Sequence, residues 1–178
     1  MSDVSKEYGE ALYRLAKAEG LEDQLLEETR TAAAVFKENP AYLSLLSSPD
    51  LAKAERTNAV AQAFAGAHRY LINFLSLMVE RGYSRDLPDC FAEYLRLYRE
   101  DRGIAVAKIV SARPLSEGEK TKLTAALERR YDVKVEPEYK VDPSLIGGMK
   151  VEISGTLLAG SARRRLDGLR ADLSALTL

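Results

Sequence analysis

The spacing of apolar residues changes near Gly103, and this change restricts what the chain can fold into. Before Gly103, apolar residues recur every three or four positions, which is the spacing of amphipathic helices. After Gly103, runs appear in which every second residue is apolar, which is typical of half-buried strands. We therefore predict two domains with almost no linker between them, a helical one over residues 1–103 and a mixed one over residues 104–178.

The first domain is predicted to be an all-α bundle of six helices. Asp3 is the expected N-cap of the first helix and Gly20 its C-terminal stop. Pro40 suits the first position of the third helix, where the missing N–H costs nothing. The fifth helix, at about residues 68–81, is apolar nearly all round. Such a helix lies in the middle of a bundle or is covered by something else.

The second domain is predicted to be a small α+β domain with the element order β-α-β-β-β-α. Residues 104–110 form a nearly continuous apolar run, which favours a strand buried on both faces. Ser116 and Glu119 have the spacing of a capping box and predict the start of a helix. Strands are expected over residues 133–141, 149–153 and 156–158. Leucines spaced by three and four residues then indicate a last helix.

Composition argues against catalysis. The 178 residues contain a single histidine, His68, and a single cysteine, Cys90, so neither an internal disulfide nor a zinc site built on cysteine pairs is expected. Gly147 and Gly148 precede a strand, whereas the glycines of a phosphate loop precede a helix N-terminus. We expect no catalytic residues, no metal and no cofactor. An enzyme remains an alternative only if several carboxylates gather around His68, which is otherwise expected at a helix start.

The charge is balanced over the chain but not within each domain. The 26 basic and 27 acidic residues give a net charge of −1, which excludes a nucleic-acid or membrane binder driven by bulk charge. The first domain has 13 basic and 17 acidic residues (net −4), and the second has 13 and 10 (net +3). Arg163, Arg164 and Arg165 form the densest basic run, so a nucleic-acid binder is kept as an alternative to a solvated helix start. No targeting signal and no apolar run near the roughly 20 residues of a membrane span is present, and we expect a soluble, intracellular protein.

Apolar surface is the strongest specific signal for function. The first helix combines small residues with Tyr8, Leu12 and Leu15, and the fifth helix has more apolar face than one packing contact uses. Small residues between large ones make a groove into which a partner helix can fit. The alternative, that the fifth helix is simply the buried centre of the bundle, is equally compatible with the pattern.

Four stretches of the chain carry a family resemblance. They are Glu7–Ala16, Phe74–Gly82, Val110–Leu115 and, most specific, Val141–Gly148, which is followed by a predicted strand and then by Gly160 and Ser161. In order and spacing they are similar to the delta subunit of bacterial F-type ATP synthases, the relative of the mitochondrial oligomycin-sensitivity-conferring protein. The sequence departs from that family at Tyr83, where arginine is usual, and at Ala159, where aspartate is usual.

The resemblance implies a non-catalytic stator subunit at the cytoplasmic face of the bacterial plasma membrane. Such a subunit links the catalytic head to the peripheral stalk and so supports proton-driven ATP synthesis, and it contacts the membrane only through the complex. In the family, the first and fifth helices hold the N-terminal helix of an alpha subunit, and the second domain meets the b subunits. The alpha-subunit groove carries over onto Tyr8, Ala11, Leu12, Leu15, Phe74, Leu77 and Met78. The candidate surface for the b subunits is formed by Leu166, Leu169 and Leu173 of the last helix.

Overall fold

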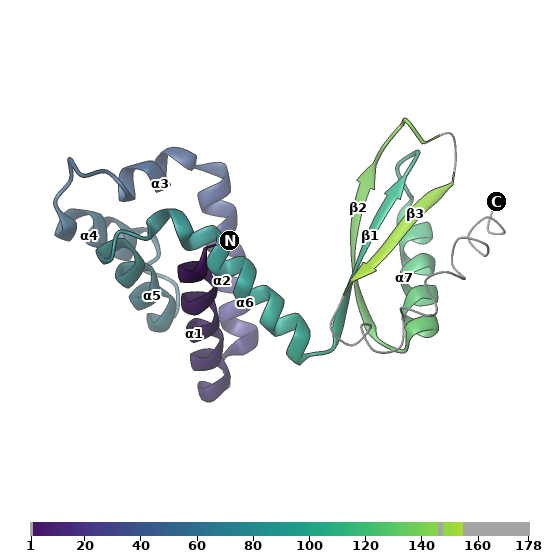
Figure 1. Ribbon diagram of the computed structural model, residues 1–178, viewed down its shortest axis with the longest axis horizontal. Helices are drawn as coiled ribbons and strands as arrows, with labels where there is room; N and C mark the ends of the chain where they lie inside the picture. Colours follow the sequence, from purple (N-terminus) through teal and green to yellow (C-terminus); the bar gives the residue numbers. More distant parts are fainter. Residues whose placement is uncertain (1, 146–147, 155–178) are drawn as a thin grey trace. The chain divides into compact units, whose positions relative to one another are not determined.

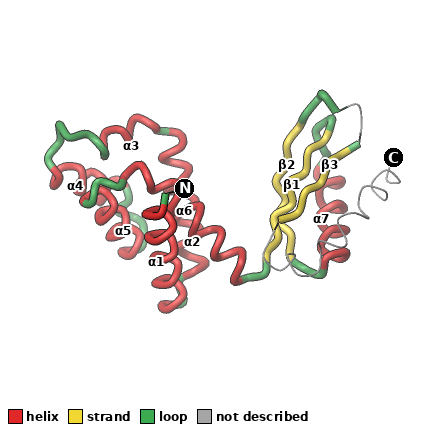
Figure 2. The backbone as a smooth tube through the Cα atoms, viewed as in Figure 1, coloured by secondary structure: helices red, strands yellow, loops and turns green. Residues whose placement is uncertain are grey.

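The computed structural model describes residues 2–145 and 148–154 of the chain. It divides into two compact units, Met1–Tyr98 and Arg99–Leu178, which are described separately below. Helices make up most of the described chain, and one small sheet lies in the second unit (Figures 1 and 2). The chain is therefore a helical N-terminal domain followed by a small α/β domain.

The helical unit is built from helices joined by short turns. Their bounds are α1 (Asp3–Glu19), α2 (Glu22–Glu38), α3 (Pro40–Leu46), α4 (Lys53–Ala63), α5 (Arg69–Glu80), the short 3-10 helix η1 (Ser84–Asp86) and α6 (Leu87–Asp101) (Figure 1). The last turn of α6 already belongs to the second unit.

Local signals set most of the helix ends. Gly20 adopts the left-handed conformation at the end of α1 (φ 67°), and Pro40 opens α3, both as predicted. The predicted N-cap of α1 is wrong, because Ser2 rather than Asp3 takes that position. The Ser2 hydroxyl accepts from the Ser5 N–H at 3.1 Å and donates to the Asp86 carboxylate at 2.6 Å. Asp3 instead provides negative charge in the first turn, which favours the helix dipole.

The core of the helical unit is centred on aromatic side chains from several helices. Phe36 of α2 is 1% exposed, and its ring lies 5.7 Å from that of Phe64 and 6.3 Å from that of Phe91. Leu71, Leu75 and other large aliphatic residues of α5 fill the space beside them. Burying one such side chain stabilises a fold by about 1.5–3 kcal/mol. The amphipathic pattern of each helix thus produces one continuous core.

A glycine allows α1 and α6 to pack closely. A Cβ atom on Gly9 would lie 2.6 Å from the carbonyl oxygen of Cys90 and 2.8 Å from the Cβ of Glu93. Glu93 itself is only 5% exposed, and two nitrogens of Arg96 donate to its carboxylate at 2.7 and 2.9 Å. These hydrogen bonds hold the pKa of Glu93 below its usual value against the opposing effect of burial. No pattern in the sequence indicated this buried carboxylate.

The second unit contains a three-stranded mixed sheet with the strand order β2-β1-β3. Strand β1 (Ile104–Ser111) is central, β2 (Lys134–Val141) runs parallel to it, and β3 (Met149–Ser154) runs antiparallel. Helix α7 (Glu117–Tyr131) connects β1 to β2. In the register, Ala107 lies between Pro137 and Ile153. The strand predicted over residues 156–158 and the last helix lie outside the described residues.

Among the described residues, β1 is fully buried on one face only, so the predicted burial on both faces is not borne out there. Its residues alternate, with Ala105, Ala107 and Ile109 buried and Lys108 exposed on the other face. Only one face packs against α7 in the part of the chain that the structure describes, and Leu127 of α7 joins the same apolar cluster. A continuous apolar run does not reveal which face another element covers.

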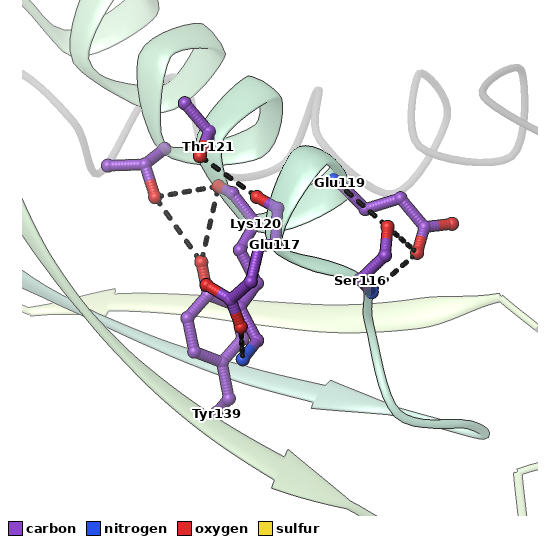
Figure 3. Close-up of polar contacts among 7 residues, drawn as sticks. Ser116, Glu117, Glu119, Lys120, Thr121 and Tyr139 are labelled. Carbon is purple, nitrogen blue, oxygen red and sulfur yellow. Dashed lines mark hydrogen bonds and ion pairs between the residues drawn. The ribbon is translucent and has the colours of Figure 1, made fainter.

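Polar contacts hold α7 in place at its first turn. The predicted capping box is confirmed: the Ser116 hydroxyl accepts from the Glu119 N–H at 3.3 Å, and the Glu119 carboxylate accepts from the Ser116 N–H at 2.8 Å (Figure 3). Arg113 also donates to that carboxylate, and together these bonds lower the pKa of Glu119 to about 2. Figure 3 shows the Tyr139 hydroxyl of β2 reaching the carbonyl oxygen of Lys120, 3.3 Å away. The start of α7 is thereby linked to the sheet.

Candidate partner-binding face

The seven residues predicted to hold a partner helix fall into a buried and an accessible group. Leu12, Phe74 and Met78 lie in the core with exposures of 2%, 8% and 0%. These three side chains therefore do not form the surface that a partner would contact. Tyr8 is half-buried and Ala11 exposed, while Leu15 and Leu77 are each 38% exposed. We call the four accessible residues, Tyr8, Ala11, Leu15 and Leu77, the α1–α5 face.

Helix α1 carries two apolar stripes that differ in burial. The inner stripe includes Gly9, Leu12 and Ala16, all of them buried. The outer stripe begins at Val4, and its members recur every four and three residues, so they share one side of the helix. It consists of Val4, Tyr8, Ala11 and Leu15. A single helix of this unit therefore uses one stripe for the core and presents a second one outward.

Helix α5 is largely buried, so the interpretation of this helix as the centre of the bundle accounts for most of its apolar character. Its buried residues are Leu71, Phe74, Leu75, Met78 and Val79. Leu77 does not follow this pattern, because more than a third of its surface is exposed. Asn73, one turn earlier, is exposed as well. The outward side of α5 thus offers one large apolar residue beside an amide.

Exposed large apolar side chains are few among the residues that the structure describes. They are Leu15, Leu45, Leu77 and Val141. Two of the four belong to the set predicted from the sequence, and they lie on the two helices named in that prediction. Tyr8 of α1 also packs on Tyr83, which follows α5 closely, with ring centroids 5.9 Å apart. The N-terminal half of α1 is therefore next to the C-terminal end of α5.

Two charged residues of α1, each directly preceding a residue of this face in the sequence, are paired with each other. Arg14 donates to Glu10 at 2.6 Å, and both side chains are well exposed. An exposed pair of this kind contributes little to stability, at most about 1 kcal/mol. A partner could separate the two groups at low cost, so the pair does not obstruct binding.

The chemistry-bearing residues singled out in the sequence have structural roles. His68 caps α5, and its side chain accepts a hydrogen bond from the Tyr70 N–H. Cys90 is buried, and burial together with Asp86 and Asp89 raises the pKa of its thiol to about 12. A thiol in that state is a poor nucleophile at neutral pH. Gly148 adopts a positive φ of 76° just before β3.

Residues 2–145 and 148–154 contain neither a metal-ligand cluster nor a membrane-spanning helix. No cluster of three or more His, Cys, Asp or Glu side chains there could hold a metal ion. None of the helices in that part combines the length and the apolar character that a bilayer crossing requires.

Several predicted residues lie outside the described part of the chain. These are the candidate b-subunit surface (Leu166, Leu169 and Leu173) and the basic run Arg163, Arg164 and Arg165. The structure does show residues that the predicted site left out. Val4 continues the outer stripe of α1, and Tyr83 packs against Tyr8. The four-three spacing of α1 was sufficient to find Val4, whereas Tyr83 has no such signal.

Known proteins resemble this chain over nearly its full length. The sequence profile described as "ATP synthase delta (OSCP) subunit" matches residues 4–173. A protein named ATP synthase subunit delta from Geobacillus sp. (strain WCH70) is 36% identical over 171 residues, which are 96% of each chain. One of the same name from Gloeobacter violaceus is 35% identical over 174 residues, covering 96% of this chain and 94% of that one.

The fold also has a counterpart of known structure. A chain in the cryo-EM structure of the Toxoplasma gondii mitochondrial ATP synthase hexamer superimposes with a TM-score of 0.69 and 20% identity, covering 99% of this chain and all of that one. The fold and the sequence relatives agree with the resemblance inferred from motifs. The chain belongs to the ATP synthase delta (OSCP) subunit family, and it is a structural rather than a catalytic subunit of that complex.

Proposed function

We propose that this protein links the catalytic head of ATP synthase to the peripheral stalk. In this proposal the helical domain, residues 1–103, binds the N-terminal amphipathic helix of an alpha subunit at the α1–α5 face. The observation that carries it is the exposure of Leu15 and Leu77 beside a well-filled core. Because the core is already filled, these accessible apolar side chains add little to folding, and exposed apolar groups of this kind mark sites where a protein partner binds.

The shape of the face favours a helix as the partner. Ala11 lies between Tyr8 and Leu15 on the outer stripe, and its small side chain lets another backbone approach closely. The stripe repeats every three to four residues, as an amphipathic helix in the partner would also do. A stator must resist torque. Nanomolar affinity corresponds to about 12 kcal/mol, which an interface of about 800 Å² per partner can supply when its centre is well packed.

The second domain, residues 104–178, is proposed to bind the b subunits. The contact is assigned to Leu166, Leu169 and Leu173. A last strand and a last helix are part of the same proposal, which gives the domain the element order β-α-β-β-β-α. It places the protein peripherally at the cytoplasmic face of the bacterial plasma membrane. The support is the family membership together with the leucine spacing in the sequence.

A peptide titration tests the α1–α5 face. A peptide copying the N-terminal helix of an ATP synthase alpha subunit should shift the amide signals of α1 and α5 in the full-length protein. Leu77→Asp and Ala11→Asp should each weaken binding at least about tenfold, since burying an unpaired carboxylate costs more than the 1.4 kcal/mol that tenfold represents.

Leu45→Asp is the matched control for this titration. Leu45 is 44% exposed on α3, a helix that contributes no residue to the α1–α5 face, so this exchange should leave the affinity unchanged. Equal losses in all three variants, or shifts confined to other helices, would show that the face is wrongly assigned. A peptide that binds nowhere on the protein would contradict the proposed link to the alpha subunit.

A further inference from the structure

The N-terminus of α5 is capped by the only histidine of the chain. His68 has the extended backbone of an N-cap residue (φ −61°, ψ 142°), and its Nδ1 atom accepts from the Tyr70 N–H at 3.3 Å. Ser, Thr, Asp and Asn usually fill this position, and their side-chain oxygens accept at every pH near neutrality. A histidine gives the helix a cap that can be lost by protonation.

The capping bond fixes the protonation state of the ring. An acceptor at Nδ1 needs a free lone pair, so the neutral ring in this geometry carries its proton on Nε2. A protonated imidazole has two N–H donors and no acceptor. In that state Nδ1–H would face the Tyr70 N–H, and the cap would be lost. Histidine is the side chain that ordinarily changes charge between about pH 5 and 8.

Charged and titratable groups from two helices surround His68. On α5, the Arg69 guanidinium lies 5.0 Å from the centre of the Tyr70 ring, and that ring lies 4.9 Å from the imidazole. From α2, the carboxylate of Glu28 accepts from the His68 backbone N–H at 2.9 Å. A proton on the ring would add positive charge at the positive end of the α5 dipole and near Arg69. Glu28 is the opposite charge within reach.

We propose that His68 is a pH-sensitive cap that controls the first turn of α5. When neutral, the imidazole caps α5 through Tyr70. When protonated, it turns away from Tyr70 toward Glu28, so the helix cap is exchanged for a contact with α2 and the first turn of α5 loosens. α5 also carries Leu77 of the α1–α5 face, so a loosened α5 should bind the partner more weakly in acid. That consequence rests on the proposed function, whereas the proposal that His68 is a pH-sensitive cap does not.

Unfolding of the full-length protein without any partner tests the cap. The wild type, His68→Asn and His68→Ala are compared at about pH 7.5 and about pH 5.5, with urea unfolding followed through the amide signals of α5. Asparagine keeps an acceptor that does not titrate, whereas alanine removes the cap at both pH values. A lost cap is worth about 1 kcal/mol, or roughly fivefold in the unfolding equilibrium.

The expected result is a change in one ratio. The unfolding constant of the wild type relative to His68→Asn should rise by up to roughly fivefold on acidification, while the ratio of His68→Ala to His68→Asn stays constant. Glu28→Gln should enlarge the wild-type change, because it removes the contact that compensates for the lost cap. A wild-type ratio that is constant, or that falls in acid, would overturn the proposal.

Two further measurements separate the cap from its consequence. The imidazole nitrogen signals should identify the Nε2–H tautomer at about pH 7.5, and the Tyr70 amide signal should follow the titration of the ring. The opposite tautomer would disprove the capping bond. The alpha-subunit peptide is then titrated at both pH values. Loss of the cap with unchanged peptide affinity would leave the cap established and disprove only its effect on binding.

Discussion

The helical unit and the α/β unit bury their apolar residues in different ways. The helical unit packs aromatic and long aliphatic side chains from every helix around Phe36, and its fully buried residues include Tyr94, Leu25 and Met78. The described core of the α/β unit is smaller and contains two alanines, Ala105 and Ala107. The packing of large side chains therefore contributes most to the stability of the first unit, and the pairing of strand backbones contributes most to that of the second.

The helix on the sheet shows the same contrast. α7 has one buried residue, Leu127, whereas α5 has five. What anchors α7 is polar: the capping box at Ser116 and the hydroxyl of Tyr139. A unit held by packing should respond most to changes of volume, and a unit held by polar contacts should respond to caps and charges. The predictions below test that difference.

Phe36→Ala should have the largest effect and should act on the helical unit. Removing a buried aromatic ring from a packed core costs about 3–5 kcal/mol, and Phe36 contacts the rings of Tyr42, Phe64 and Phe91. Urea unfolding, followed through amide signals of each unit separately, measures the loss. If the α/β unit were destabilised as strongly as the helical unit, the contrast between the two units would fail.

Gly9→Ala should destabilise the helical unit by about 1–3 kcal/mol, the usual cost of overpacking. The new methyl group would approach the Cys90 carbonyl oxygen and the Cβ of Glu93 to well below van der Waals contact, so α1 and α6 must move apart. Because the outer stripe lies on α1, we also expect weaker binding of the alpha-subunit peptide. A variant of unchanged stability would show that the close approach of these helices is not needed.

Gly118→Ala, the same exchange in α7, should have the opposite sign. Gly118 lies in the first turn of this helix, and no atom of the described residues lies within 4 Å of where its Cβ would be. Alanine in a helix is favoured over glycine by about 0.5–1 kcal/mol, so the α/β unit should gain stability. The thermal midpoint of that unit measures the gain. A loss of stability would mean that the first turn of α7 is as closely packed as α1 is at Gly9.

Sequence patterns predicted local features well and tertiary features poorly. Gly20, Pro40 and the Ser116–Glu119 box mark helix ends because their effect depends on the adjacent backbone alone. The predicted burial of β1 on both faces is not borne out among the described residues, because burial depends on which elements cover the sheet. Leu12 and Leu15 were both predicted to line the partner-binding groove, yet Leu12 is buried and Leu15 exposed. Burial of that kind is decided by neighbouring helices, which no single-helix pattern contains.

Neutralising Glu119 in acid should produce the smallest effect, and this contribution belongs to the α/β unit. Hydrogen bonds from Arg113 and Ser116 lower the pKa of Glu119 from 4.5 to about 2 in the folded protein. The stability that its charged form contributes is therefore fully present above about pH 4.5 and is lost as the pH falls toward about 2. Glu119→Gln keeps an acceptor for the Ser116 N–H but does not titrate.

The difference in urea midpoint between wild type and Glu119→Gln isolates this contribution. It should be constant near neutral pH and should shrink as the pH falls from about 4.5, because the wild-type carboxylate then becomes neutral as the amide already is. The effect stays small because both Glu119 and Arg113 are solvent-exposed, and water screens their interaction. The same difference measured in the helical unit is the internal control: it should be zero at every pH, because neither Glu119 nor Arg113 belongs to that unit and its own acid-sensitive groups are identical in both proteins. A difference that persists unchanged in acid would show that the charge of Glu119 does not stabilise the start of α7, and α7 would then depend on packing after all.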